Sequence, residues 1–126
     1  MNTLANKRLL IVDDEDSNLF ALKSYLETMD VEIFVVKNGE EAIAFLSGET
    51  KPDIILLDMM MPVMDGYETL KVLNETGHLN LIPVIAVTAR AMNGDREKCL
   101  EAGAWDYISK PLDMNLLVEK LNHWVK

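Results

Sequence analysis

The sequence has little of what marks a secreted, membrane-embedded or nucleic-acid-binding protein. It contains one cysteine, so no disulfide can form within the chain. It has no apolar run long enough to cross a bilayer and no segment with the pattern of a signal peptide. Lys and Arg number 12 against 21 Asp and Glu, and the net charge of −9 would repel nucleic acid and anionic membranes alike. We therefore expect a cytoplasmic protein that contacts neither directly.

The rest of the composition is that of one globular domain. The chain has 126 residues, of which 49% are hydrophobic and 26% are charged, and this length suits a single core. We expect residues 7–126 to form the domain and residues 1–6 to be a flexible tail. Cys99 has no His or second Cys at a ligand spacing, so we interpret it as a packing residue, with a reactive thiol as the alternative.

Short apolar runs alternate with segments of helical spacing along the chain. The runs are rich in β-branched residues and nearly continuous, as in strands that are buried on both faces of a sheet. They cover residues 9–12, 33–36, 54–57 and 84–87, and a weaker fifth run covers 105–108. Helices between such strands imply a parallel sheet with right-handed crossovers. The sequence therefore predicts an α/β fold of the (βα)₅ type, a doubly wound five-stranded parallel sheet.

Polar residues mark where several helices are expected to begin. Asn38 is a suitable cap for the second helix, and Glu41 is placed to bond back to that end. The third helix is expected to begin near Gly66 and the last one after Asp113. The fourth is expected over residues 94–102.

Polar side chains follow four of the five predicted strands, at the point where each strand ends. They are Asp13, Asp14 and Glu15 after the first, Asp58 after the third, Thr88 after the fourth and Lys110 after the fifth. The carboxyl ends of parallel strands meet at one edge of the sheet, where ligands bind in such folds. The second strand ends in Lys37 and does not contribute, which fits strand order 2-1-3-4-5, because that order places it at the sheet edge.

This collection of groups suits a hard divalent cation and an anion. Mg²⁺ prefers oxygen ligands and often binds through a few carboxylates plus a phosphate, with Mn²⁺ as an alternative metal. Without the metal, neighbouring carboxylates repel one another, so at least one should have a raised pKa. Asp58 is the candidate nucleophile for a phosphoryl group, which Thr88 and Lys110 would help to hold.

The motifs at these positions resemble the receiver domain of two-component response regulators, the CheY-like family, over residues 7–125. The resemblance implies the flavodoxin-like form of the fold and rests on four pieces in order, Leu10-Ile11-Val12-Asp13-Asp14-Glu15, Ile55-Leu56-Leu57-Asp58-Met59-Met60-Met61-Pro62-Val63-Met64-Asp65-Gly66, Ala86-Val87-Thr88-Ala89 and Gly103-Ala104-Trp105-Asp106-Tyr107-Ile108-Ser109-Lys110-Pro111.

The resemblance also implies how the metal is bound and how the phosphoryl group arrives. Asp14, Asp58 and the backbone carbonyl of Met60 would bind Mg²⁺ directly, and Asp13 would act through a metal-bound water. Asp58 would accept a phosphoryl group from a histidine kinase or a histidine phosphotransfer protein. The fourth helix, fifth strand and last helix would then present an altered face to a downstream protein, which the sequence does not identify.

Further roles follow from the resemblance. Thr88 and Tyr107 would be the switch residues, although Tyr107 is also suited to a half-buried place in a strand. The peptide bond between Lys110 and Pro111 would be cis. Met60 and Arg90 would flank the entry to the pocket and tune the attack of water on the acyl phosphate.

Two other functions fit the same architecture. A phosphohydrolase that forms an aspartyl phosphate usually has a second acidic residue just after the nucleophile, where this chain has Met59 and Met60. A flavin-binding module would need a first strand-to-helix loop rich in Gly, Ser and Thr, and here that loop is acidic. The chain could be a stand-alone regulator or the receiver of a larger protein such as a hybrid histidine kinase.

Overall fold

The structure is a computed structural model that describes residues 4–61, 63–89 and 95–125. Within these residues, five strands form one parallel sheet in the order β2-β1-β3-β4-β5. The strands are β1 (Arg8–Val12), β2 (Glu32–Val36), β3 (Ile54–Asp58), β4 (Val84–Thr88) and β5 (Asp106–Ser109). The predicted fold class and strand order are thus confirmed.

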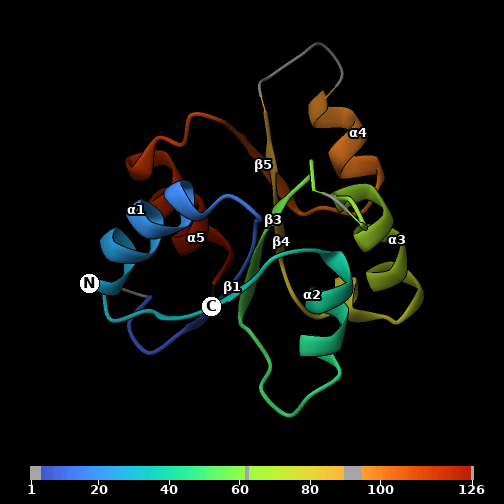
Figure 1. Ribbon diagram of the computed structural model, residues 1–126, viewed down its shortest axis with the longest axis horizontal. Coiled ribbons are helices and arrows are strands. Elements are labelled where there is room, and N and C mark those ends of the chain that lie inside the picture. Colours follow the sequence, from blue (N-terminus) through green and yellow to red (C-terminus); the bar gives the residue numbers. More distant parts are fainter. Residues whose placement is uncertain (1–3, 62, 90–94, 126) are drawn as a thin grey trace.

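Helices cover both faces of the sheet. They are α1 (Asp16–Glu27), α2 (Gly39–Leu46), α3 (Gly66–Glu75), the short 3₁₀ helix η1 (His78–Asn80), α4 (Asp95–Glu101) and α5 (Met114–Trp124). Helices α1 and α5 lie on one face, and α2, α3 and α4 lie on the other (Figure 1). None of the helices in the described residues is long and apolar enough to span a membrane.

The central strands alternate their side chains between two separate cores. In β1, Leu9 and Ile11 pack on the side of α1 and α5, whereas Leu10 and Val12 pack on the side of α2, α3 and α4. Successive residues of a strand point to opposite faces, so a strand covered on both sides needs apolar residues at every position. This accounts for the continuous apolar runs in β1, β3 and β4.

Strand β2 departs from that pattern. The sequence predicts burial on both of its faces, but Ile33, Phe34, Val35 and Val36 are each only partly buried. The reason is position: β2 is the last strand on its side of the sheet and pairs only with β1. Its apolar run reflects strand propensity at a sheet edge, which run length alone does not distinguish from full burial.

Helix starts largely follow the capping residues. The side chain of Asn38 accepts a hydrogen bond from the Glu41 N–H at 3.0 Å, which caps α2 as predicted. The Glu41 side chain bonds back one residue earlier than a capping box would place it, to the N–H of Lys37 at 2.8 Å. Helix α3 begins at Gly66 behind a full capping box formed by Asp65 and Glu68.

Small differences occur at other boundaries. Strand β5 begins at Asp106, one residue later than predicted, and the sequence pattern did not indicate η1. The described part of α4 lies within the predicted range of 94–102, of which Gly94 is outside the described residues. Asp113 caps α5 through hydrogen bonds from two backbone N–H groups, as expected.

Ordered packing begins earlier in the N-terminal segment than expected. Leu4 is 1% exposed and belongs to the core on the side of α1 and α5. The Asn6 N–H donates to the carbonyl of Asp30 at 2.9 Å, which fixes the segment beside β2. Residues 4–6 therefore differ from the flexible tail predicted for residues 1–6, because one leucine in a polar segment anchors it. Residues 1–3 lie outside the described residues.

Candidate functional site

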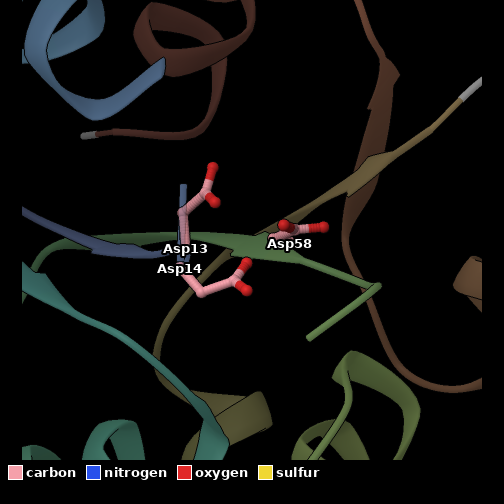
Figure 2. A group of neighbouring side chains, drawn as sticks. All are labelled: Asp13, Asp14 and Asp58. Atoms are coloured by element: carbon pink, nitrogen blue, oxygen red, sulfur yellow. The ribbon is translucent and has the colours of Figure 1, made fainter. Parts of the chain in front are cut away.

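Three carboxylates meet at the carboxyl ends of β1 and β3. Asp13, Asp14 and Asp58 each offer a carboxylate oxygen, and these oxygens all lie within 4.8 Å of one another (Figure 2). Strands β1 and β3 are neighbours in the sheet, so strand pairing brings Asp13 and Asp14 to Asp58, which is 45 and 44 positions away in the sequence. Asp13 and Asp58 are buried, whereas Asp14 is exposed at the mouth of the site.

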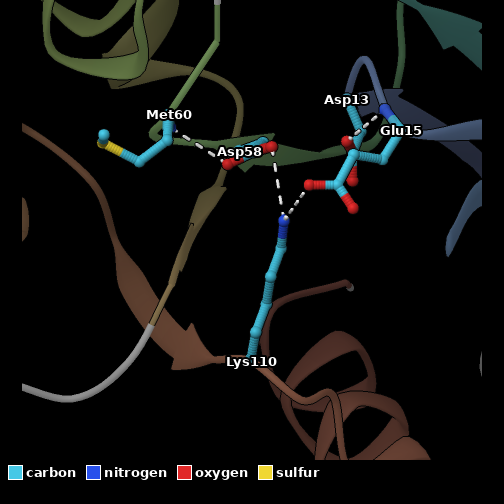
Figure 3. Close-up of polar contacts among 5 residues, drawn as sticks. All are labelled: Asp13, Glu15, Asp58, Met60 and Lys110. Carbon is cyan, nitrogen blue, oxygen red and sulfur yellow. Dashed lines mark hydrogen bonds and ion pairs between the residues drawn. The ribbon is translucent and has the colours of Figure 1, made fainter.

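The Asp58 carboxylate is held by one group on each oxygen. Oδ1 accepts a hydrogen bond from the Met60 N–H at 3.0 Å, and Oδ2 accepts one from Lys110 Nζ at 3.4 Å (Figure 3). The backbone behind it is tightly packed: a Cβ added to Gly66 would lie 2.6 Å from Met59 Cα and 3.1 Å from the Asp58 carbonyl oxygen. The start of α3 therefore requires glycine so that it can approach the end of β3 closely.

Burial raises the pKa of Asp58 to about 6 from an ordinary value of 3.8. The hydrogen bond from the Met60 N–H and the charge of Lys110 act in the opposite direction, and the neighbouring charge of Asp13 raises the pKa further. Desolvation outweighs both favourable contacts because the side chain is only 3% exposed. The raised pKa expected in the metal-free cluster is thus found at Asp58, but its main cause is burial, not the repulsion between carboxylates on which the expectation rested.

Lys110 reaches the cluster from the end of β5. Its ammonium lies 3.4 Å from Asp58 Oδ2 and 3.9 Å from Glu15 Oε1, so it contacts two carboxylates from different strand ends. The peptide bond between Lys110 and Pro111 is cis. Sequence reasoning placed Lys110 here but missed its contact with Glu15. The only signal was the position of Glu15 directly after the two aspartates.

Thr88 ends β4 beside Asp58, since the register pairs Asp58 with Val87. Its hydroxyl oxygen is buried and has no hydrogen-bond partner among the described residues. Leaving a buried hydroxyl unsatisfied is unfavourable, and it is uncommon outside functional sites. This hydroxyl is available to a group that binds in the pocket.

The other predicted site residues are not all at the cluster. Met60 is 69% exposed, and its backbone N–H contacts Asp58. Tyr107 lies in β5, partly buried against the core on the side of α2, α3 and α4. Arg90 lies outside the described residues. The roles predicted for these three residues, including the metal contact of the Met60 carbonyl, stay predictions.

The cluster suits a hard divalent cation. All the donor atoms are carboxylate oxygens, which Mg²⁺ prefers over nitrogen or sulfur. Burial, with a smaller contribution from Asp13, raises the pKa of Asp58 despite Lys110 and the Met60 N–H, so a bound cation would stabilise the ionised carboxylate. Asp13 has one oxygen occupied by the N–H of Glu15 at 2.9 Å, which leaves its second oxygen for a ligand. The residues present therefore fit a metal site with an open coordination sphere.

Comparison with known proteins decides between the architectures that share this topology. Residues 9–122 match the family described as the response regulator receiver domain. The chain belongs to this family. It is therefore a receiver domain of two-component signalling systems, a class of signalling domain, and the resemblance noted in the sequence is confirmed.

Similar proteins include a short response regulator and a much longer hybrid kinase. The polar-differentiation response regulator DivK of Brucella anthropi is 37% identical over 119 residues, which cover 94% of this chain and 96% of DivK. The hybrid signal transduction histidine kinase I of Dictyostelium discoideum is 37% identical over 125 residues, which cover 92% of this chain and 7% of that kinase.

Solved receiver domains are also close in structure. One belongs to the sensor histidine kinase PA1611 of Pseudomonas aeruginosa and has a magnesium ion coordinated in its active site cleft. Its TM-score is 0.83 at 33% identity, with coverage of 96% of this chain and 98% of that one. Another, from Saccharomyces cerevisiae, is a co-crystal of the histidine phosphotransfer protein Ypd1 with the receiver domain of Ssk1. The matched chain has a TM-score of 0.89 at 27% identity, covering 97% of this chain and 90% of its own length.

Proposed function

We propose that Asp58 accepts a phosphoryl group from a phosphohistidine donor, a histidine kinase or a histidine phosphotransfer protein, in a reaction that requires Mg²⁺. The observation that carries this proposal is the buried Asp58 carboxylate beside Lys110, two further carboxylates and the unsatisfied hydroxyl of Thr88. The domain catalyses only its own phosphorylation and dephosphorylation. The Ssk1 receiver, which was solved with a phosphotransfer protein, supports this class of partner.

The transfer is a nucleophilic substitution at phosphorus. One oxygen of the Asp58 carboxylate attacks, and an O–P bond forms as the P–N bond of the phosphohistidine breaks. The electron pair of the broken bond leaves with the imidazole, which then takes a proton from solvent. With its pKa raised to about 6, Asp58 is mostly ionised at neutral pH and so is ready to attack.

The surrounding groups compensate the charge of the phosphoryl oxygens. Lys110 supplies an ammonium, and the Thr88 hydroxyl has an unused donor. Asp14, Asp58 and the Met60 carbonyl would hold the metal, with Asp13 acting through a water. When bound there, Mg²⁺, or Mn²⁺ in its place, would supply positive charge to the clustered carboxylates and to the phosphoryl oxygens. The magnesium ion in the PA1611 receiver supports this assignment.

The output we propose is a change in the face formed by α4, β5 and α5. Thr88 would move toward the phosphoryl group and Tyr107 would turn inward from its partly buried place in β5. A downstream protein would read the new surface. A shift from mostly inactive to mostly active requires about 5.5 kcal/mol of differential stabilisation. We place this unit, residues 7–126, in the cytoplasm, with no contact to nucleic acid or membrane, in accord with its net charge of −9.

We also propose that the phosphorylated state is long-lived. The exposed side chain of Met60 cannot hydrogen-bond a water molecule that attacks the acyl phosphate. Together with Arg90 it would set the rate of that attack. Replacing Met60 by Gln, which can bind such a water, should shorten the lifetime, as followed by intact mass over time. A wild-type lifetime of only seconds at neutral pH with Mg²⁺ present would contradict this prediction.

Incubation with acetyl phosphate and Mg²⁺, followed by intact mass measurement, tests the phosphoacceptor. The wild type should gain one phosphoryl group, and Asp58→Asn should gain none. Omitting Mg²⁺ should abolish the gain in the wild type as well.

The matched control is Asp30→Asn. Asp30 is exposed and has a φ of 62°, a conformation that Asn accepts readily, so the same chemical change is made without strain and outside the cluster. This variant should be phosphorylated like the wild type. The assignment of Asp58 fails if Asp58→Asn gains the same mass as the control.

A further inference from the structure

The ammonium of Lys110 is shared between two carboxylates. Nζ lies 3.4 Å from Asp58 Oδ2, within hydrogen-bond distance, and 3.9 Å from Glu15 Oε1, within the range of an ion pair (Figure 3). The Asp58 side chain is 3% exposed, that of Lys110 22% and that of Glu15 57%. Glu15 thus holds the same cation as the buried nucleophile, but from the solvent side.

The main chain of Glu15 is fixed on both sides. Its N–H donates to Asp13 Oδ1 at 2.9 Å, and its carbonyl accepts the first helical hydrogen bond of α1 from Leu19 at 3.2 Å. It occupies the N-cap position of α1 with φ −96° and ψ 105°. The orientation of its side chain therefore starts from a defined backbone position beside the metal-binding aspartates.

The side chain of Glu15 does not act as a helix cap. Among the described contacts of α1, it makes no capping hydrogen bond, whereas the short polar residues preferred at this position usually do. Its extra methylene group instead brings the carboxylate across to Lys110. An aspartate here would retain the charge but would be one methylene too short to keep the same contact, and it is the length suited to capping.

We propose that Glu15 is a positioning residue for Lys110, an inference that rests on the phosphoacceptor role of Asp58. Glu15 keeps part of the ammonium's charge away from Asp58 in the unphosphorylated domain. An incoming phosphoryl group must draw Lys110 away from Glu15, which slows acceptance. Once the phosphoryl group is bound, Lys110 is on its oxygens, so Glu15 has little effect on its loss.

A general effect of negative charge is the competing explanation. Any carboxylate near the mouth of the pocket repels an anionic donor, and its removal speeds acceptance whether or not it contacts Lys110. Two variants separate these cases. Glu15→Gln removes the charge and the ion pair together, whereas Glu15→Asp keeps the charge near the pocket, at the N-cap of α1, and removes the reach to Lys110.

The experiment measures the rate of phosphorylation by acetyl phosphate with Mg²⁺, and the rate of phosphoryl loss after donor removal, by intact mass. Ion pairs of this exposure are weak, so we expect acceptance to be about threefold faster in both Glu15→Gln and Glu15→Asp. The rate of loss should equal that of the wild type. A disturbed fold would lower the rate of acceptance, so this split between the two rates distinguishes positioning from a structural defect.

Glu27→Gln is the matched control, because Glu27 is an exposed glutamate at the opposite end of α1. It should behave like the wild type in both rates. Faster acceptance in Glu15→Gln but not in Glu15→Asp would mean that Glu15 acts only through its negative charge, and it would overturn the proposal. Unchanged or slower acceptance in both variants would overturn it as well. A wild type and control that take up no phosphoryl group would instead show that the phosphoacceptor assignment itself is wrong.

Discussion

Two aspartates at opposite ends of the sheet have opposite electrostatic environments. Asp58 ends β3, and burial raises its pKa to about 6. Asp106 begins β5, and although burial alone would raise its pKa, hydrogen bonds hold it below the ordinary value. Its Oδ2 accepts from Trp124 Nε1 at 2.9 Å, and its Oδ1 accepts from Lys120 Nζ at 2.9 Å and from the Tyr107 N–H at 2.8 Å.

The comparison separates a carboxylate that stabilises the fold from one whose charge is only partly compensated, as the proposed phosphoacceptor role requires. Asp106 has donors enough to compensate its charge, and these link β5 to the last turns of α5. Asp58 has one backbone donor and one lysine that is shared with Glu15. Incomplete compensation costs stability, but it leaves the carboxylate able to bind a cation and a phosphoryl group.

The same substitution at the two sites should therefore change stability in opposite directions, with the larger effect at Asp58. Asp58→Asn should raise the free energy of unfolding at pH 7 without metal by up to about 3 kcal/mol, because a neutral amide avoids the burial of a charge. Urea unfolding monitored by circular dichroism measures this. A loss of stability would mean that the contacts with Lys110 and Met60 outweigh desolvation.

The pH dependence of stability tests whether the charge of Asp58 causes this difference. The pKa of Asp58 is raised in the folded state, so the folded protein binds its proton more tightly, and stability falls as pH rises through the window from about 4 to 6. The difference between the wild type and Asp58→Asn should shrink as pH is lowered through that window. A difference that stays constant with pH would point to packing rather than charge.

Asp106→Asn should lower the free energy of unfolding by about 2 kcal/mol at pH 7, because it removes the charge that Lys120 and Trp124 contact. The depressed pKa of Asp106 gives the sign of its pH dependence: its contribution is present at neutral pH and is lost as pH falls below the ordinary value of 3.8. Equal destabilisation by Asp58→Asn and Asp106→Asn in the same urea titration would remove the contrast between the two sites.

Mg²⁺ should reduce the difference in stability between the wild type and Asp58→Asn, because it supplies positive charge that compensates the Asp58 carboxylate. At a concentration ten times its dissociation constant, a ligand of the folded state alone adds about 1.4 kcal/mol. We expect this gain in the wild type and in Asp106→Asn, and little of it in Asp58→Asn. Thermal unfolding across a Mg²⁺ series tests this, and an equal gain in all three proteins would place the metal elsewhere.

The smallest expected effect concerns backbone strain. At the far end of the sheet, the described non-glycine residues with positive φ are Asn6 before β1 and Asp30 before β2, and both residue types tolerate this region. Near the pocket, the β3–α3 connection has Val63 at φ 68° with a side chain that is 70% exposed. Val63→Asn should stabilise the domain by about 1 kcal/mol in urea unfolding. The control variant Asp30→Asn should leave the free energy of unfolding unchanged. If Val63→Asn also leaves it unchanged, Val63 is not strained.

The positions of the site residues could be predicted because chain order and topology suffice for them. Strand ends of one parallel sheet meet at one edge. The apolar runs together with strand order 2-1-3-4-5 therefore predict that the residues at these ends lie together, namely Asp13, Asp14, Asp58, Thr88 and Lys110. Capping residues such as Asn38 and Asp113 likewise act within a few positions of the helices they begin. Local sequence patterns and a simple topology were therefore sufficient to predict most of the fold.

Contacts between long side chains of different helices and strands have no comparable pattern in the sequence. The Asp106 bonds to Lys120 and Trp124 span 14 and 18 positions without any periodicity that marks them. The ion pair between Glu15 and Lys110 needs the length of both side chains and the local path of the chain after β1. The partial exposure of β2 follows from its place at the sheet edge, which the predicted strand order includes but the apolar run of β2 alone does not indicate.

The tryptophan pair has a practical consequence for spectroscopy. Both tryptophans of the chain, Trp105 and Trp124, lie edge to face with ring centroids 5.4 Å apart, beside Asp106 at the end of the sheet far from Asp58. The tryptophan fluorescence of the chain therefore comes from one place, and a ligand bound at Asp58 does not contact either ring. Any change in fluorescence on metal binding or phosphorylation would measure a signal transmitted through the sheet or α5, not a local quenching event.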